Sequence, residues 1–206
     1  MEKVAIIDFE TTGLSPAMGD RATEVAVVIV DNCKIADQFQ SLMNAGVSVP
    51  PFIESLTGIS NAMIRKAPPV AKVMNELAKF VGNVPLVAHN ASFDCKFLDA
   101  EWSRISQLRQ QEFACSMLLA RRFYPASPNH KLGTLVSYLG LPSAARHHRA
   151  LADAEMTAHL WIKMISDIKQ KYGMRVVPHD LLCTLQRMPK TQINSCIVRA
   201  KHNLGA

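Results

Sequence analysis

Short apolar runs separated by polar turns predict a β-sheet in this chain. Residues 4–7 form a continuous apolar run, which is typical of a buried central strand. Residues 25–30 form another, rich in β-branched side chains, and a turn at Asp31-Asn32 precedes a partly alternating segment that predicts a returning strand. In all, the pattern predicts strands at residues 4–7, 25–30, 34–42, 84–88 and 113–117.

Apolar residues at spacings of three and four predict helices in the rest of the chain. The predicted helices cover residues 70–81, 92–105 and 132–139, and a long one runs through residues 157–168. Gly82 follows the first as a C-terminal cap, and Gly140 and Pro142 stop the third. Because strands come first as a meander and then alternate with helices, we expect a mixed five-stranded sheet flanked by helices in an α/β domain.

The composition limits the class of protein. Of the 206 residues, 49% are apolar and 19% are charged, so the chain can bury a core of domain size. No apolar run approaches the roughly 20 residues of a membrane-spanning helix, and the N-terminus lacks the apolar stretch of a signal peptide. The five cysteines are scattered without a CxxC pair, which favours reduced thiols in a cytoplasmic protein with no membrane contact.

Asp8 and Glu10 stand at the end of the first predicted strand. Their spacing of two places both side chains on the same face. Neighbouring carboxylates repel each other, which raises at least one pKa unless a cation lies between them. Mg²⁺ is the natural candidate because it prefers oxygen ligands. Taken alone, however, such a pair is more often a solvated strand end.

Two later segments supply further candidate side chains. Residues 89–94 follow the fourth strand and put Asp94 in the first turn of a helix, where the helix dipole also favours an acid. Residues 148–154 put His148 before the long helix and Asp153 near its start, an offset that lets both reach one site. Taken alone, this segment also fits a capping acid with a solvated histidine. Small residues would let the helix approach the sheet closely: Ala150, Ala152 and Ala154.

In their order, the three segments resemble the motifs of the DEDDh exonucleases. This ribonuclease H-like family includes the proofreading subunit of bacterial replicases and ribonuclease T. Motif one resembles residues 8–14 (Asp-Phe-Glu-Thr-Thr-Gly-Leu), and motif two resembles residues 89–94 (His-Asn-Ala-Ser-Phe-Asp). Motif three resembles the His-x-Ala-x-x-Asp-Ala of residues 148–154. The resemblance spans residues 3–170 of the sequence and implies a ribonuclease H-like fold.

The resemblance also implies metal-binding and catalytic roles. The metal ligands would be Asp8, Glu10, Asp153 and, for a second ion, Asp94. Two Mg²⁺ ions, with Mn²⁺ as a substitute, would activate the attacking water and stabilise the leaving oxygen. His148 would be the general base, since an ordinary imidazole pKa suits proton removal near neutrality. His147 is its rival, and the distance along the chain to Asp153 favours His148.

Further positions are expected to contact the terminal nucleotide. By resemblance these are Thr11, Thr12, Leu14, Ile59 and Phe93. Packing in the core explains Phe93 equally well. Some family members have histidine where this chain has Thr57, so a base contact is not expected there.

The resemblance implies hydrolysis of phosphodiester bonds from a 3′ end with release of nucleoside 5′-monophosphates. The expected partner is a nucleic acid with a free 3′ end, and the expected substrate is single-stranded DNA. The alternatives are trimming of RNA 3′ ends and a non-catalytic nucleic-acid-binding module on the same fold, although suitable residues fill every catalytic position. The sequence is also compatible with a homodimer and with association with a polymerase.

Basic residues concentrate near the C-terminus. The chain has a net charge of +6, and residues 173–206 carry four of these charges, so we divide it into an exonuclease domain, residues 1–172, and a basic extension, residues 173–206. Three leucines between Pro178 and Pro189 predict a short amphipathic helix that would pack on the domain. The alternative is that the extension binds phosphates upstream of the scissile bond through Arg187, Lys190, Arg199 and Lys201.

Overall fold

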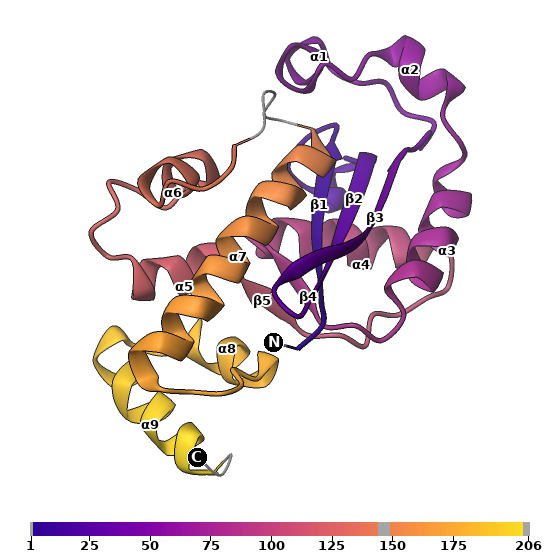
Figure 1. Ribbon diagram of the computed structural model, residues 1–206. Coiled ribbons are helices and arrows are strands. Elements are labelled where there is room, and N and C mark those ends of the chain that lie inside the picture. The colour runs from indigo at the N-terminus through magenta and orange to yellow at the C-terminus, as the bar shows by residue number, and fades with distance from the viewer. Residues whose placement is uncertain (1, 144–148, 204–206) are drawn as a thin grey trace.

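The sheet is mixed and has five strands. The computed structural model describes residues 2–143 and 149–203. The strands are β1 (Val4–Thr11), β2 (Ala22–Asp31), β3 (Lys34–Leu42), β4 (Leu86–Ala88) and β5 (Phe113–Cys115), in the order β3-β2-β1-β4-β5 (Figure 1). All five predicted strands are confirmed, although β2 begins three residues earlier than predicted and β4 two residues later. The predicted last strand ends at Cys115 because a helix begins at the next residue.

β1 lies at the centre of the sheet, antiparallel to β2 and parallel to β4. Its side chains alternate between two apolar cores: Ile6 belongs to one and Ile7 to the other. β2 pairs with β1 on one side and β3 on the other, and its residues 22–30 are all buried. Burial of both faces explains why these two strands are continuous apolar runs in the sequence.

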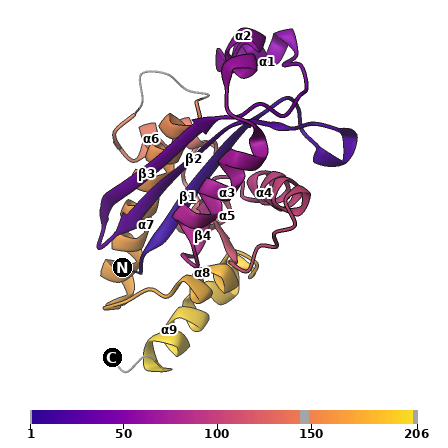
Figure 2. The ribbon, with the colours of Figure 1, turned by 90° about the vertical axis from the view of Figure 1, so that its right-hand side faces the viewer.

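Helices cover both faces of the sheet, with α7 on one and α3 and α4 on the other (Figure 2). Their bounds are α1 (Pro51–Thr57), α2 (Asn61–Lys66), α3 (Val70–Val81), α4 (Ser92–Arg104), α5 (Ser116–Phe123), α6 (Leu132–Tyr138), α7 (Ala150–Tyr172), α8 (His179–Leu185) and α9 (Ile193–Asn203), with 3-10 turns η1 (Pro16–Met18) and η2 (Lys190–Gln192). The four predicted helices are confirmed as α3, α4, α6 and α7. The sequence did not predict α1, α2, α5 and α9; the first three have only six to eight residues, which carry too little periodicity.

The start of α7 packs closely on β1 and β2. Ala150, Ala154 and Ala158 are fully buried in the same core as Ile6. A methyl side chain on this face lets the helix backbone come near the strands, as the sequence predicted. The first turn of α7 is thereby held beside the face of β1 that carries Asp8 and Glu10.

Residues 47–66 form a lobe that stands apart from the two main layers (Figure 2). The lobe contains α1 and α2 and has its own small core of Val49, Ile53, Ile59 and Ile64. The two connections of the lobe meet at its base, where Asn44 N donates to Pro68 O at 2.8 Å and Val70 N donates to Asn44 O at 3.1 Å. This arrangement makes the lobe a compact unit joined to the sheet through one narrow base.

The basic extension packs on the domain. Leu182, Leu185 and Ile197 are buried in the same core as the inner face of α7. The Gln186 amide donates to Phe113 O at 2.9 Å and accepts from Cys115 N at 2.5 Å, so it occupies the open edge of β5. These contacts confirm the predicted short helix, as α8, and support the packing alternative for this segment.

The extension lies at the far end of the molecule from the predicted catalytic residues. α8 and α9 sit beside the N-terminus and the end of α7, whereas Asp8 and Glu10 belong to the opposite end of β1 (Figure 1). With 23 residues, α7 spans about 35 Å between the two regions. Binding of phosphates further upstream on a strand by the basic residues of this segment stays a prediction. No helix in the part of the chain that the structure describes is long and apolar enough to cross a membrane.

Candidate active site

Three predicted carboxylates converge where β1 meets the first turn of α7. Each of Asp8, Glu10 and Asp153 offers an oxygen, and these three oxygens all lie within 4.8 Å of one another. Asp8 and Glu10 share a face because side chains alternate along a strand. Asp153 joins them because the buried alanines bring α7 close to β1. The sequence motifs that lie far apart in the chain therefore meet at one point.

Asp94 approaches the same point from the other layer of the molecule. It lies in the first turn of α4 and is only 2% exposed. Its Oδ1 accepts a hydrogen bond from Phe9 N at 3.2 Å, and Phe9 stands between Asp8 and Glu10. In this position Asp94 fixes the backbone between the two strand carboxylates. It is outside the group of three oxygens, so direct metal ligation by Asp94 stays a prediction.

The pKa values of these carboxyls are raised. Burial, followed by repulsion from Asp94, Asp153, Glu10 and Glu24, holds the pKa of Asp8 well above its usual range. Burial and then repulsion from Asp153 raise the pKa of Glu10 to about 8. Burial also raises the pKa of Asp94 to about 8, against the opposing effect of its backbone hydrogen bonds. A divalent cation with oxygen ligands would remove this repulsion, so the residues fit the metal that the motifs imply.

These raised pKa values predict that the metal-free protein loses stability as the pH rises. In the unfolded chain Glu10 and Asp94 ionise at 4.5 and 3.8, whereas each ionises at about 8 in the folded protein. Between these values the folded state holds more protons, so the free energy of unfolding falls with increasing pH. We expect the melting temperature in a chelator to fall from pH 5 to pH 8, and Mg²⁺ at pH 8 to restore it. A Glu10→Gln variant should show a shallower fall, and an equally steep one would contradict the assignment.

Glu24 is a site residue that the sequence reasoning missed. It pairs with Glu10 across β1 and β2 and is 0% exposed. Its carboxylate accepts two hydrogen bonds from the Arg149 guanidinium, at 2.7 and 3.0 Å, and one from Ala150 N at 3.1 Å. Glu24 thus caps the N-terminus of α7 and holds its first turn beside the carboxylates. The sequence feature that could have identified Glu24 is its position as an acid within a strand that is otherwise mostly apolar.

Arg149 in turn is the cation that compensates Glu24. It also lowers the pKa of Glu10, although burial and the neighbouring carboxylates outweigh this effect. Arg149 directly follows His148 in the sequence. His147 and His148, the two candidates for the general base, lie outside the described residues. The Glu24–Arg149 ion pair therefore anchors the chain at the residue next to the predicted base.

Removal of Arg149 is expected to destabilise the fold strongly. An Arg149→Ala variant leaves the buried Glu24 carboxylate without its cation, which should cost about 3–5 kcal/mol in the free energy of unfolding. Urea denaturation in the presence of a chelator measures this. The matched control is Lys163→Ala, which breaks the more exposed Lys163–Asp167 ion pair and should cost about 0–1 kcal/mol. Equal losses in both variants would show that Glu24 does not depend on Arg149.

The residues that the sequence predicted to contact a nucleotide differ in their exposure. Thr11 and Thr12 are buried at the end of β1, whereas Leu14 is 77% exposed in the loop that follows. Lys96 joins this loop to α4, since its Nζ donates to Leu14 O at 2.9 Å and lies 5.5 Å from the centre of the Phe93 ring. Lys96 therefore lies close to both the Leu14 carbonyl and the Phe93 ring, and contact of either residue with a nucleotide stays a prediction.

Two other predicted positions have mainly structural contacts. Phe93 also packs against Phe97, with 5.0 Å between ring centres, so part of its surface belongs to the core. The Ile59 side chain is fully buried in the lobe. Contact of a nucleotide with Ile59 stays a prediction. Thr57 donates its hydroxyl to Ile53 O at 2.9 Å and accepts from Ile59 N at 3.1 Å, which fixes the turn at this position.

Comparison with known proteins agrees with this geometry. A family model described as exonuclease matches residues 5–161. The chain is 36% identical over 172 residues to the PolC-type DNA polymerase III of Bacillus subtilis, covering 82% of this chain and 12% of that protein. It is 34% identical over 191 residues to the 3′-5′ exonuclease DinG of Bacillus subtilis, covering 91% and 19%. The chain thus spans less than a fifth of the length of these relatives.

A solved structure described as exonuclease X in complex with 5′ overhanging duplex DNA has the same fold. It superimposes with a TM-score of 0.66 at 30% sequence identity, covering 79% of this chain and 91% of the other. The resemblance seen in the sequence motifs therefore extends to the ribonuclease H-like arrangement of sheet and helices. Since the match covers most of the chain and includes Asp8, Asp94 and Asp153, the chain belongs to the exonuclease family.

Proposed function

We propose that this chain is a divalent-metal-dependent 3′→5′ exonuclease that releases nucleoside 5′-monophosphates from DNA. The convergence of the Asp8, Glu10 and Asp153 oxygens within 4.8 Å carries this proposal. Half-buried carboxylates at such distances repel one another and therefore favour a bound cation. The polarity and the DNA substrate are supported by the 3′-5′ exonuclease and DNA polymerase relatives and by the DNA complex among the similar structures.

Mg²⁺ is the proposed metal, with Mn²⁺ as a substitute, because the donors are carboxylate oxygens. Asp8, Glu10 and Asp153 would hold it, and Asp94 would support a second ion. When bound, two such ions activate the attacking water and stabilise the leaving oxygen of an in-line displacement. The same ions would neutralise the repulsion that raises the pKa values of the free carboxyls.

The side chains of this protein would supply positioning and proton transfer. Asp94 accepts a hydrogen bond from Phe9 N, which would fix the backbone between the two strand carboxylates. Glu24 and Arg149 hold the first turn of α7, which carries Asp153. We propose His148 as the base that takes a proton from the attacking water. Leu14 and Phe93 would support the terminal nucleotide beside the carboxylates.

Single-stranded DNA is the proposed substrate, and trimming of RNA is the main alternative. Discrimination between the two sugars depends on contacts to the 2′-hydroxyl. Association with a polymerase is proposed because the PolC-type relatives are DNA polymerases. A homodimer and a cytoplasmic location stay proposals from the sequence.

Digestion of 5′-labelled oligonucleotides tests this function. Single-stranded DNA, duplex DNA with a 5′ overhang, and RNA of the same sequence are incubated with Mg²⁺, Mn²⁺ or a chelator. We expect a ladder that shortens from the 3′ end on DNA with metal, and no products with chelator. Faster digestion of RNA would favour the trimming alternative. Binding of DNA without cleavage under every metal condition would favour the non-catalytic module.

A further inference from the structure

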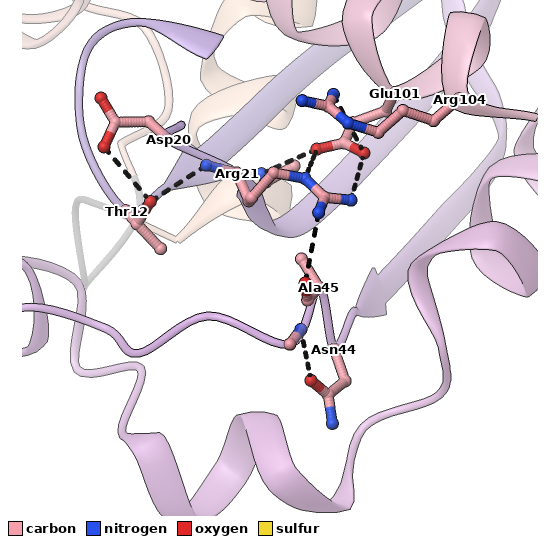
Figure 3. Close-up of polar contacts among 9 residues, drawn as sticks. Thr12, Asp20, Arg21, Asn44, Ala45, Glu101 and Arg104 are labelled. Carbon is pink, nitrogen blue, oxygen red and sulfur yellow. Dashed lines mark hydrogen bonds and ion pairs between the residues drawn. The ribbon is translucent and has the colours of Figure 1, made fainter. Parts of the chain in front are cut away.

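A buried ion pair between Arg21 and Glu101 connects three segments around the candidate site. Arg21 Nε and Nη2 donate to the two carboxylate oxygens of Glu101, each at 2.8 Å (Figure 3). Glu101 is only 1% exposed and also accepts from Ala22 N at 3.4 Å. Arg104 adds a looser contact at 3.6 Å. This bidentate contact fixes the orientation of the guanidinium plane, whereas a lysine ammonium could not make two parallel hydrogen bonds of this kind.

The first segment held by this ion pair is the loop that links β1 to β2. Arg21 closes the loop, because its N donates to Thr12 Oγ1 at 3.0 Å and its carbonyl accepts from Thr12 N at 2.9 Å (Figure 3). Asp20 lies inside the loop, where its Oδ2 accepts a hydrogen bond from Ser15 N at 2.9 Å. The space is so tight that a Cβ on Gly13 would lie 2.4 Å from Asp20. The exposed Leu14 therefore projects from a rigid loop.

The second segment is the base of the lobe. Arg21 Nη1 donates to Ala45 O at 3.2 Å, next to the point where the two connections of the lobe meet at Asn44 (Figure 3). Gly46 N in turn donates to Asn44 Oδ1 at 2.9 Å. The lobe has its own core, against which Leu42 of β3 also packs, so the contacts at this base and at Leu42 place it on the sheet. The guanidinium thus links the lobe that contains Ile59 to the loop that contains Leu14.

The third segment is α4, which supplies Glu101 itself. The same helix carries Asp94, Phe93 and Lys96. The ion pair therefore joins the helix that supports the strand carboxylates to both the loop and the lobe. No other ion pair that the structure shows within residues 2–143 and 149–203 joins the β1–β2 loop to α4.

We propose, on the basis of the function proposed above, that Arg21 and Glu101 are positioning residues for the terminal nucleotide. They set the distance between the Leu14 loop and the Ile59 lobe, the two segments that hold residues expected from the sequence to contact the terminal nucleotide. Neither residue belongs to the carboxylate group at the metal site. Loss of the ion pair should therefore weaken binding of the terminal nucleoside and leave the chemistry at the carboxylates intact.

Two small phosphodiesters distinguish a loss of nucleoside binding from a loss of chemistry at the carboxylates. Thymidine 5′-(4-nitrophenyl phosphate) carries a terminal nucleoside, whereas bis(4-nitrophenyl) phosphate does not. For Arg21→Lys we expect kcat/KM on the thymidine ester to fall by about 10- to 100-fold through KM, which is typical of a misplaced binding group. The rate on bis(4-nitrophenyl) phosphate should stay within about twofold. The matched control is Arg104→Gln, which removes the looser contact to Glu101 and should behave as wild type on both esters.

Calorimetric titration with thymidine 5′-monophosphate gives a readout that does not need turnover. We expect Arg21→Lys to raise Kd by about 10- to 100-fold and Arg104→Gln to leave it unchanged. If Arg21→Lys does not fold cooperatively, the double variant Arg21→Met with Glu101→Met replaces it, since no buried charge is then left unpaired. Wild-type affinity in the folded variant, or no binding by wild type, would overturn the inference. Equal losses on both esters would also overturn it. If wild type hydrolyses neither ester nor any oligonucleotide, the proposed function fails and the titration still decides the role of Arg21.

Discussion

Replacement of Asp8 by alanine is expected to lower kcat for strand cleavage by about 10³-fold or more. Asp8 contributes one of the three converging carboxylate oxygens, so its removal takes away one of the proposed metal ligands. Metal ions at such sites contribute several kcal/mol of transition-state stabilisation, and each ~1.4 kcal/mol corresponds to a tenfold change in rate. Single-turnover cleavage of a labelled strand in saturating Mg²⁺ measures the loss.

The same substitution should not destabilise the metal-free protein. Burial and four neighbouring acids hold the pKa of Asp8 well above its usual range, so its charge opposes folding near neutral pH. The melting temperature of Asp8→Ala in chelator should therefore equal or exceed that of wild type. Asp37→Ala, on the exposed strand β3, is the matched control and should keep full activity. Cleavage by Asp8→Ala at the wild-type rate would refute the metal assignment.

Replacement of His148 by alanine is expected to slow turnover by about 10²–10⁴-fold, the usual contribution of a general base. In wild type the rate should rise with pH as the imidazole loses its proton and becomes able to accept another. In His148→Ala this rise should disappear, because the titrating group is gone. A pH–rate profile of kcat/KM on a single-stranded oligonucleotide, with Mg²⁺ held constant, measures both effects.

The neighbouring histidines supply the controls for this experiment. His147→Ala tests the rival base, and His159→Ala changes a histidine further along α7; both variants should retain most of the activity. A large loss in His147→Ala with a small one in His148→Ala would reverse the assignment of motif three. The resulting register would place the base six residues before Asp153 rather than five.

The sequence was sufficient for the main elements of the fold and for the carboxylates. β1 and β2 were predicted because burial on both faces requires continuous apolar runs. α3 and α7 were predicted because one covered face gives a helical period. Asp8 and Glu10 were predicted to share a face because the period of a strand is two. These are local consequences of backbone geometry, so a short stretch of sequence contains them.

The two ion pairs that organise the site were decided by tertiary structure. Glu24 lies 125 residues from Arg149, and Arg21 lies 80 residues from Glu101. No local period marks such partners, because each pair forms only after the sheet and the helices have packed. The same reason applies to the basic extension, whose charges suggested phosphate binding. Its Gln186 meets the edge of β5, 73 residues away at Phe113, whereas phosphate binding by its basic residues stays a prediction. The sequence thus predicted which groups carry the chemistry, and only packing between distant segments decided what holds them in place.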